Sequence, residues 1–210
     1  LIAEDLVRQN IFSQNKVEIL YDPVLYLKKI RINKRKKVNN INKNKLVAIG
    51  RLTKQKNFKF LIECFSEITK NYNQFTLHII GDGEEKTSLE KLIKKENLDQ
   101  KVFLEGYKSE ISTHLHNSYC FILSSLWEDP GFVIIESAIN NTIILSSNCE
   151  TGPKEILKNN ENSFVFENNN KVSFINSFDK MIKTDEKTKF KMKLSIKKKL
   201  NKFTFFKIFK

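Results

Sequence analysis

Two carboxylates near the middle of the chain, Glu128 and Glu136, bracket a segment that could bind an anion. After Gly131 the apolar residues recur at helical spacing, which predicts a helix that begins just beyond this glycine. The first N–H groups of a helix have no partner within it, and the helix dipole favours negative charge at that end. We therefore expect an anion to lie against the backbone of Gly131, Phe132 and Val133.

A second loop, residues 50–57, contributes two positive charges. It follows a predicted strand at 46–49 and holds Gly50, Arg51 and Lys56 before the next predicted helix. Loops that leave the carboxyl ends of parallel strands meet at one edge of the sheet, so Arg51 and Lys56 should face the same crevice as Gly131. A guanidinium offers a planar fork of donors and an ammonium a point charge, and both suit phosphate oxygens. Two solvated loop cations are the alternative, but the nearby helix start and carboxylates favour a phosphate site.

Other motifs carry less chemistry. The turn Gly81-Asp82-Gly83 lacks the third glycine of a dinucleotide fingerprint, so it is interpreted as a tight turn rather than a nicotinamide or flavin site. His114 and His116 point to different sides of a predicted helix, and His78 lies in a predicted strand, so all three are interpreted as packing or surface residues. The sequence has no zinc-type Cys/His spacing and no Asp-x-Asp pair, and no metal is expected.

These loops are positioned by alternating strands and helices, a pattern that predicts a parallel sheet with right-handed crossovers. The predicted strands are 46–49, 75–80, 102–104, 119–123, 142–145 and 164–166. The predicted helices are 57–71, a segment that ends near 96, 110–116, 132–140, 153–157, 172–182 and 188–206. The expected fold class is α/β, a Rossmann-like parallel sheet of about six strands with helices on both faces.

The bulk composition favours one globular domain. A chain of 210 residues with 40% hydrophobic residues can bury one core with appendages. It has no apolar run of about 18 residues, and residues 1–15 lack the pattern of a signal peptide. Cys64, Cys120 and Cys149 lie far apart in apolar runs, which predicts buried reduced thiols in a cytoplasmic protein. The net charge of +13 could serve a nucleic acid or a membrane, but the lysines are scattered and no nucleic-acid-binding motif is present, so no nucleic-acid partner is expected.

Six short motifs taken together resemble a known family. They are Gly50-Arg51 with Lys56-Asn57, Ile80-Gly81-Asp82-Gly83, Phe103-Leu104-Glu105-Gly106-Tyr107, Ser124-Ser125, Glu128-x7-Glu136 and Gly152-Pro153-x-Glu155. In order and spacing, over about residues 45–166, they resemble the nucleotide-sugar-binding domain of retaining glycosyltransferases of family four, the GT-B type called glycosyl transferases group 1. The resemblance implies two Rossmann-like domains that face each other across a cleft, and this chain matches only the second.

On this resemblance the chain divides into four parts. Residues 1–24 would be a remnant of the N-terminal acceptor domain with the inter-domain crossing, and 25–44 a basic linker. Residues 45–183 would be the nucleotide-sugar-binding domain, and 184–210 a C-terminal helix that in the family packs back on the N-terminal domain. Without that domain we expect orphaned apolar surface along 200–210 that could promote self-association. Contact of this Lys- and Phe-rich run with an anionic membrane is the alternative.

The resemblance also implies roles for the site residues. Arg51 and Lys56 would contact the diphosphate of the donor, and Glu128 would face the reacting carbon beside the transferred sugar. Glu136 resembles the glutamate that holds the ribose hydroxyls, and Tyr107 lies where the base usually binds. The donor-binding set would be Gly50, Gly106, Tyr107, Gly131, Phe132, Val133 and Glu136.

The implied reaction is transfer of a sugar from a UDP- or GDP-sugar to a glycan or lipid-linked acceptor with retention of configuration, in bacterial cell-surface polysaccharide or glycan synthesis. No metal or other cofactor is expected, because the two cations and the helix start would stabilise the departing diphosphate. The protein would be cytoplasmic or peripheral at the inner face of the membrane, and the isolated chain could be inactive without an acceptor domain. A nucleotide-sugar epimerase of similar fold and a catalytically silent binding module are the alternatives.

Overall fold

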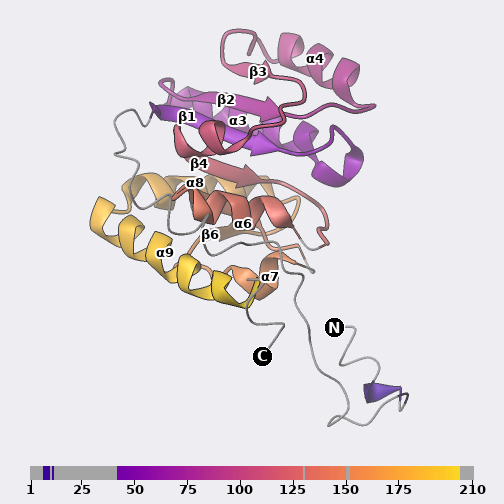
Figure 1. Ribbon diagram of the computed structural model, residues 1–210. Helices are drawn as coiled ribbons and strands as arrows, with labels where there is room; N and C mark the ends of the chain where they lie inside the picture. Colours follow the sequence, from indigo (N-terminus) through magenta and orange to yellow (C-terminus); the bar gives the residue numbers. More distant parts are fainter. Residues whose placement is uncertain (1–6, 10, 12–41, 130, 150–151, 204–210) are drawn as a thin grey trace.

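The fold is built on one parallel sheet (Figure 1). The computed structural model describes residues 7–9, 11, 42–129, 131–149 and 152–203. The expectations for the other residues, which include nearly all of the predicted domain remnant, most of the linker and the tail 204–210, lie outside this range. Six strands pair in the order β3-β2-β1-β4-β5-β6, and every neighbouring pair is parallel. They are β1 (Asn42–Ile49), β2 (Thr76–Ile80), β3 (Val102–Leu104), β4 (Ser118–Leu123), β5 (Ile143–Ser147) and β6 (Phe164–Phe166).

The central strands bury both of their faces. In β1, Leu46 and Ala48 face one hydrophobic core, while Val47 and Ile49 face the other. Parallel strands covered by helices on both sides have continuous apolar runs rather than alternation, which is how these strands stand in the sequence. The prediction of about six parallel strands with helices on both faces is confirmed.

The first core lies under three helices, α3 (Phe58–Asn71), α4 (Lys86–Lys95) and α8 (Lys171–Lys183). It is rich in phenylalanine, and the rings of Phe166 and Phe174 meet edge to face with centroids 4.9 Å apart. Helix α8 begins where the side chain of Asn170 accepts a hydrogen bond from the N–H of Ser173 at 3.0 Å, a normal helix cap. This core therefore ties the β6 end of the sheet to α3.

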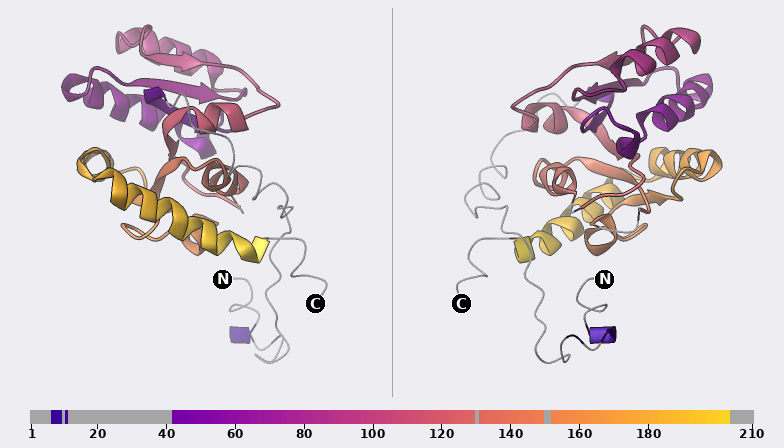
Figure 2. Two further views of the ribbon diagram at one scale, coloured as in Figure 1. Left: turned by 60° about the vertical axis from the view of Figure 1, so that its left-hand side comes forward. Right: turned by 90° about the vertical axis from the view of Figure 1, so that its right-hand side faces the viewer.

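The second core lies under a second set of helices. They are α5 (Ser112–His116), α6 (Phe132–Ile139), α7 (Pro153–Ile156), α9 (Glu186–Lys199) and the 3-10 turn η3 (Leu200–Phe203). Helix α9 lies along the outside of the domain, as Figures 1 and 2 show. It sends Met192 into the first core and Ile196 into the second, so it contributes to both. Among the described residues, no helix has both the length and the apolar composition needed to cross a membrane.

The largest differences from the predicted element ends occur in the last helix and the first strand. The last helix begins at Glu186 rather than 188, because Asp185 caps it by accepting from the N–H of Thr188 at 2.9 Å, and it becomes a 3-10 turn after Lys199. The first strand begins at Asn42 rather than 46, since polar residues there pair with the neighbouring strand although nothing in their types marks a strand.

The expectation of orphaned apolar surface from residue 200 onward is also wrong at its start. Leu200 and Phe203 are 1% and 4% exposed and pack in the second core. Their apolar surface is thus covered by this domain itself, and the sequence could not show this because the buried partners lie far away in the chain.

Candidate functional site

The candidate site lies at the carboxyl ends of β1 and β4. The chain leaves β1 towards β2 and β3 but leaves β4 towards β5 and β6, so the strand order reverses between these two neighbours. In open α/β sheets, ligands bind in the crevice at such a switch point. Loop 50–57 follows β1 and loop 124–131 follows β4, which makes the two loops predicted from the sequence neighbours.

Glycines shape this edge of the sheet. All six glycines of the chain lie in loops that follow the carboxyl ends of strands: Gly50, Gly81, Gly83, Gly106, Gly131 and Gly152. Gly81 has a φ of +148°, and a Cβ there would overlap the carbonyl oxygen of Gly50. The N–H of Gly50 in turn donates to the carbonyl of Ile80 at 3.0 Å. The turn after β2 therefore serves close packing of one backbone on another.

Lys56 crosses over Gly50 to reach Glu128. A Cβ built on Gly50 would lie 2.9 Å from Cε of Lys56, so the lysine fills the space that a side chain at Gly50 would need. The Nζ of Lys56 donates to Oε1 of Glu128 at 2.6 Å. The two side chains are 14% and 6% exposed, which makes this a largely buried ion pair. Loss of either partner would leave an uncompensated charge in a poorly solvated place.

Ser125 is a third member of this network. Its hydroxyl donates to the same Oε1 of Glu128 at 2.5 Å, and the residue is 1% exposed. Its carbonyl accepts from the hydroxyl of Ser147, at the end of β5, at 2.7 Å. The sequence marks Ser125 only as part of the motif Ser124-Ser125 that follows a predicted strand. Its contact with Glu128 depends on a loop geometry that residue spacing does not reveal.

The two loops are tied together by further hydrogen bonds. The N–H of Leu126 donates to the carbonyl of Gln55 at 2.8 Å, and the Gln55 side chain donates to the carbonyl of Trp127 at 2.9 Å. The hydroxyl of Ser124 donates to the carbonyl of Lys56 at 2.7 Å. Hydrogen bonds thus join the two loops at the switch point, and they fix the position of Lys56 relative to Glu128.

The start of α6 lies beside this pair. Gly131 has φ 75° and ψ 48°, a left-handed conformation that glycine adopts at little cost, and α6 begins at Phe132 with no side-chain cap. A Cβ on Gly131 would lie 3.7 Å from the Cβ of Glu128. The structure therefore brings together Lys56, Glu128 and the helix start, three of the features predicted for the anion site.

The other predicted site residues lie in loop 50–57, on α6 and in the turn after β3. Arg51 is exposed in the same loop as Lys56. Glu136 is partly exposed and lies four residues after Phe132, on the outward face of α6. Gly106 has a φ of +69° just beyond β3, where its carbonyl accepts from the N–H of Gly81 at 2.9 Å, and Tyr107 is 77% exposed. Arg51 thus lies in the loop after β1, Glu136 on α6, and Gly106 and Tyr107 just beyond β3.

His78 has structural partners on both ring nitrogens and on its ring face. His78 lies with Nδ1 2.8 Å from Oε1 of Glu105 and Nε2 3.2 Å from the hydroxyl of Thr76, and its ring stacks on Phe103 with centroids 4.9 Å apart. Burial lowers the pKa of His78, and the hydrogen bond from His78 lowers the pKa of Glu105. In the part of the chain that the structure describes, no three His, Cys, Asp or Glu side chains form a group that could hold a metal ion.

The cysteines are buried and unpaired, as predicted. Cys64, Cys120 and Cys149 carry no disulfide. Burial raises the pKa of Cys64 to about 12 and raises those of the other two thiols as well. A thiol with a raised pKa is a poor nucleophile, so these cysteines serve packing.

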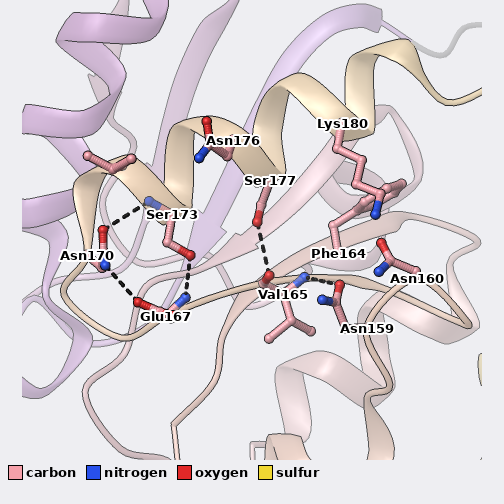
Figure 3. A pocket seen from close by; sticks show the side chains of 11 residues that line it. Asn159, Asn160, Phe164, Val165, Glu167, Asn170, Ser173, Asn176, Ser177 and Lys180 are labelled. Atoms are coloured by element: carbon pink, nitrogen blue, oxygen red, sulfur yellow. Dashed lines mark hydrogen bonds between the residues drawn. The ribbon is translucent and has the colours of Figure 1, made fainter.

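A groove of about 450 Å³ lies elsewhere, between the edge strand β6 and α8 (Figure 3). Its polar groups mainly satisfy one another. The side chain of Asn159 accepts from the N–H of Val165 at 3.2 Å, and the hydroxyl of Ser177 donates to the carbonyl of Val165 at 3.0 Å. These side chains occupy the outward backbone groups of an edge strand, which protects it against pairing with another chain. No residue of loops 50–57 or 124–131 lines this groove.

A six-stranded parallel sheet in this order, with charged side chains and a helix start at its switch point, defines a Rossmann-like domain. The family model described as glycosyl transferases group 1 matches residues 29–199, and the chain belongs to this family.

Relatives and solved structures agree with this assignment. The chain is 44% identical over 124 residues to an uncharacterized glycosyltransferase of Methanocaldococcus jannaschii, covering 58% of this chain and 30% of the relative. It is 29% identical over 185 residues to N-acetylgalactosamine-N,N'-diacetylbacillosaminyl-diphospho-undecaprenol 4-alpha-N-acetylgalactosaminyltransferase of Campylobacter jejuni, covering 87% of this chain and 49% of the relative. The chain thus spans half or less of these two relatives.

Two solved structures share the fold. Anabaena HepE in complex with UDP and glucose superposes with a TM-score of 0.73 at 17% identity, over 98% of this chain and 58% of that one. The C-terminal domain of the group 1 protein LpcC from Francisella tularensis superposes with a TM-score of 0.68 at 18% identity, over 89% of this chain and 97% of that one. The fold is therefore that of one Rossmann-like half of a GT-B glycosyltransferase, and the Francisella case is a structure of such a half by itself.

Proposed function

We propose that this chain is the donor-binding half of a retaining glycosyltransferase that uses a UDP- or GDP-sugar. The observation that carries the proposal is the Lys56–Glu128 pair beside the start of α6 at the switch point of the sheet. The UDP and glucose named for HepE lend support by analogy of fold. The comparisons name transferases and do not favour an epimerase.

The donor's diphosphate would lie between loop 50–57 and α6. Lys56 and Arg51 would donate to its oxygens, and so would the N–H groups of Phe132 and Val133, which stand in the first turn of the helix. On the outward face of α6, Glu136 would accept hydrogen bonds from the ribose hydroxyls. The base would lie towards Gly106 and Tyr107, at the end of β3.

The chemistry follows from where charge develops. As the bond between the anomeric carbon and the phosphate oxygen breaks, its electron pair leaves with the diphosphate and the sugar ring becomes partly positive. Lys56, Arg51 and the start of α6 would stabilise the departing anion, and the Glu128 carboxylate would stabilise the sugar ring. The acceptor hydroxyl would form its new bond on the face from which the diphosphate departs, and its proton would pass to a departing phosphate oxygen. Configuration at the anomeric carbon is then retained.

The acceptor would be a glycan or a lipid-linked glycan of bacterial cell-surface synthesis. The name of the Campylobacter relative, which specifies a sugar linked to diphospho-undecaprenol, supports this class of acceptor. Acceptor recognition would reside mainly in the part of the relatives that this chain does not cover.

Calorimetric titration of UDP and GDP into the chain tests the proposal. One of the two should bind, and Lys56→Ala and Arg51→Ala should each weaken binding about tenfold or more, because charge-assisted bonds to phosphate contribute about 1.5–3 kcal/mol. Lys59→Ala is the matched control, since Lys59 is 71% exposed on α3 and pairs only loosely with Glu63 at 4.0 Å. If neither nucleotide binds, or if both site variants bind like the control, the donor assignment is wrong.

Measurement of turnover distinguishes a glycosyltransferase from an epimerase and from a silent binding module. A longer protein that also contains the part of the relatives not covered by this chain should transfer sugar from the donor to an acceptor and leave the donor's sugar unepimerised when no acceptor is added. Nucleotide binding without transfer in that longer protein would instead identify a silent binding module.

A further inference from the structure

The outer face of α9 combines exposed apolar and basic side chains. Phe190 and Leu194 are 61% and 46% exposed, and Lys187, Lys191 and Lys198 are exposed beside them. We call these five residues the α9 outer face. The helix runs along the outside of the domain (Figure 2), and the exposure of these five residues shows that no other described segment covers them.

The five residues form two adjoining stripes. Phe190 and Leu194 stand one turn apart, and Lys187, Lys191 and Lys198 follow one another at intervals of four and seven residues, so each set shares one side of the helix. The opposite side is buried through Met192 and Ile196, which fixes how the helix is turned. The apolar stripe must therefore point outward, although large apolar side chains normally favour the core.

The charges on α9 are nearly all positive. Its sequence contains seven lysines and a single glutamate. The carboxylate of that glutamate, Glu186, forms an ion pair with the buried Lys189 at 3.2 Å, and not with one of the three exposed lysines. A partner of the α9 outer face must therefore be anionic and must also receive a phenylalanine and a leucine.

We infer that the α9 outer face docks on an anionic phospholipid bilayer. Phe190 and Leu194 would enter the boundary between headgroups and acyl chains, and the three lysines would contact lipid phosphates. A nucleic acid matches the positive charge but offers no apolar layer to receive Phe190 and Leu194, so the bilayer fits both properties. Docking would hold the domain at the surface where a lipid-linked acceptor resides, but the inference itself stands on α9 alone.

Co-sedimentation of the purified chain with phosphatidylcholine vesicles, with and without phosphatidylglycerol, tests the inference. The C-terminal domain of the Francisella relative is a structure obtained without its other half, so such a domain folds alone. The chain should bind the anionic vesicles and hardly bind the neutral ones. Lys187→Gln/Lys191→Gln/Lys198→Gln should weaken binding more than tenfold. Phe190→Ser/Leu194→Ser should weaken it at least several-fold although every lysine remains.

The matched control is α4, which carries Lys91, Lys94 and Lys95 exposed but has no exposed large apolar side chain. Their triple change to glutamine removes the same charge and should leave vesicle binding nearly unchanged. The segments outside the described residues are identical in every variant, so they cannot explain a difference between variants. Three results would overturn the inference. They are absence of vesicle binding by the parent chain, an equal loss of binding in the α4 and α9 glutamine variants, and full binding by the serine variant. Loss of binding in a longer protein that also contains the part of the relatives not covered by this chain would overturn it as well, because that part would then cover α9.

Discussion

The Nζ of Lys56 lies 2.6 Å from Oε1 of Glu128, although 72 residues separate them in the sequence. This contact joins the loop after β1 to the loop after β4, on either side of the switch point. In the proposed function, the same ammonium must also serve the donor's diphosphate. One cation then has two anionic partners, and the carboxylate competes with the phosphate for it.

Replacing Glu128 by glutamine is therefore expected to tighten the binding of UDP or GDP. Glutamine keeps the size of the side chain and an oxygen that can accept from Ser125, but it releases Lys56 and removes a negative charge near the phosphates. We expect a gain of several-fold to about tenfold, since 1.4 kcal/mol corresponds to a factor of ten. Titration calorimetry of the nucleotide measures it.

The same change in a Lys56→Met background separates competition from plain repulsion. Removing repulsion between Glu128 and the phosphates should help equally with and without Lys56, whereas releasing Lys56 can help only when Lys56 is present. The gain should thus be smaller in the methionine background. Equal gains in the two backgrounds would rule out competition for Lys56 and leave the donor assignment itself intact.

Stability should respond unequally to the loss of either partner. Lys56→Met leaves the carboxylate of Glu128 buried with its cation removed, and we expect a loss of about 3 kcal/mol in the free energy of unfolding. Glu128→Gln leaves a lysine that can extend its charge towards solvent, and a loss of about 1 kcal/mol is expected. Urea unfolding followed by circular dichroism measures both. A larger loss in the glutamine variant would mean that Lys56, rather than Glu128, depends on the pair.

Two glycines of the same edge should differ in their tolerance of a side chain. Gly81→Ala places a Cβ against the carbonyl of Gly50, and the backbone would have to shift, so we expect a loss of more than about 3 kcal/mol and weaker nucleotide binding. At Gly106 a Cβ meets no atom within 4 Å, and only the strain of its positive φ remains, which costs about 1 kcal/mol. Thermal unfolding of the two alanine variants compares them directly. Equal losses would show that backbone packing between the loops contributes little.

Much of the fold could be predicted because parallel strands covered on both sides carry continuous apolar runs. The strands at 102–104 and 164–166 have the predicted bounds, and the others differ by a few residues at their ends. The errors fall where local residue type is uninformative. Asn42 is polar yet pairs with β4, and Leu200 and Phe203 are apolar yet covered by a distant core. Such contacts depend on tertiary packing, which a local pattern does not encode.

The site could be predicted in part for a related reason. Arg51, Lys56, Glu128 and Gly131 could be selected as candidates because each stands just beyond a predicted strand or before a predicted helix, and parallel strands end at one edge. That Lys56 and Glu128 form an ion pair, with Ser125 on the same oxygen, could not be predicted. This ion pair forms because Gly50 leaves room for the lysine and because hydrogen bonds join the two loops. The spacing of residues in the sequence reveals neither condition.

The unfolding free energy should decrease as the pH falls through the range in which histidine titrates. Burial lowers the pKa of both His78 and His114 below the ordinary value of 6.5, and the hydrogen bond with Glu105 opposes this for His78 without reversing it. Between the lowered pKa and 6.5 the unfolded chain binds more protons than the folded chain. Stability therefore rises with pH across this window, is fully present above it and is lost below it.

Asparagine at position 78 tests this, because its amide can still donate to Glu105 but does not titrate. His78→Asn should lose less stability than the parent chain between about pH 7.5 and about pH 5.5, measured from urea midpoints. Glu105 gives a separate contribution, because its lowered pKa makes its stabilisation disappear only at more acid pH, as the carboxylate takes up its proton. An unchanged slope in the asparagine variant between those two pH values would show that His78 does not titrate against folding, and the pH dependence would then have to come from His114.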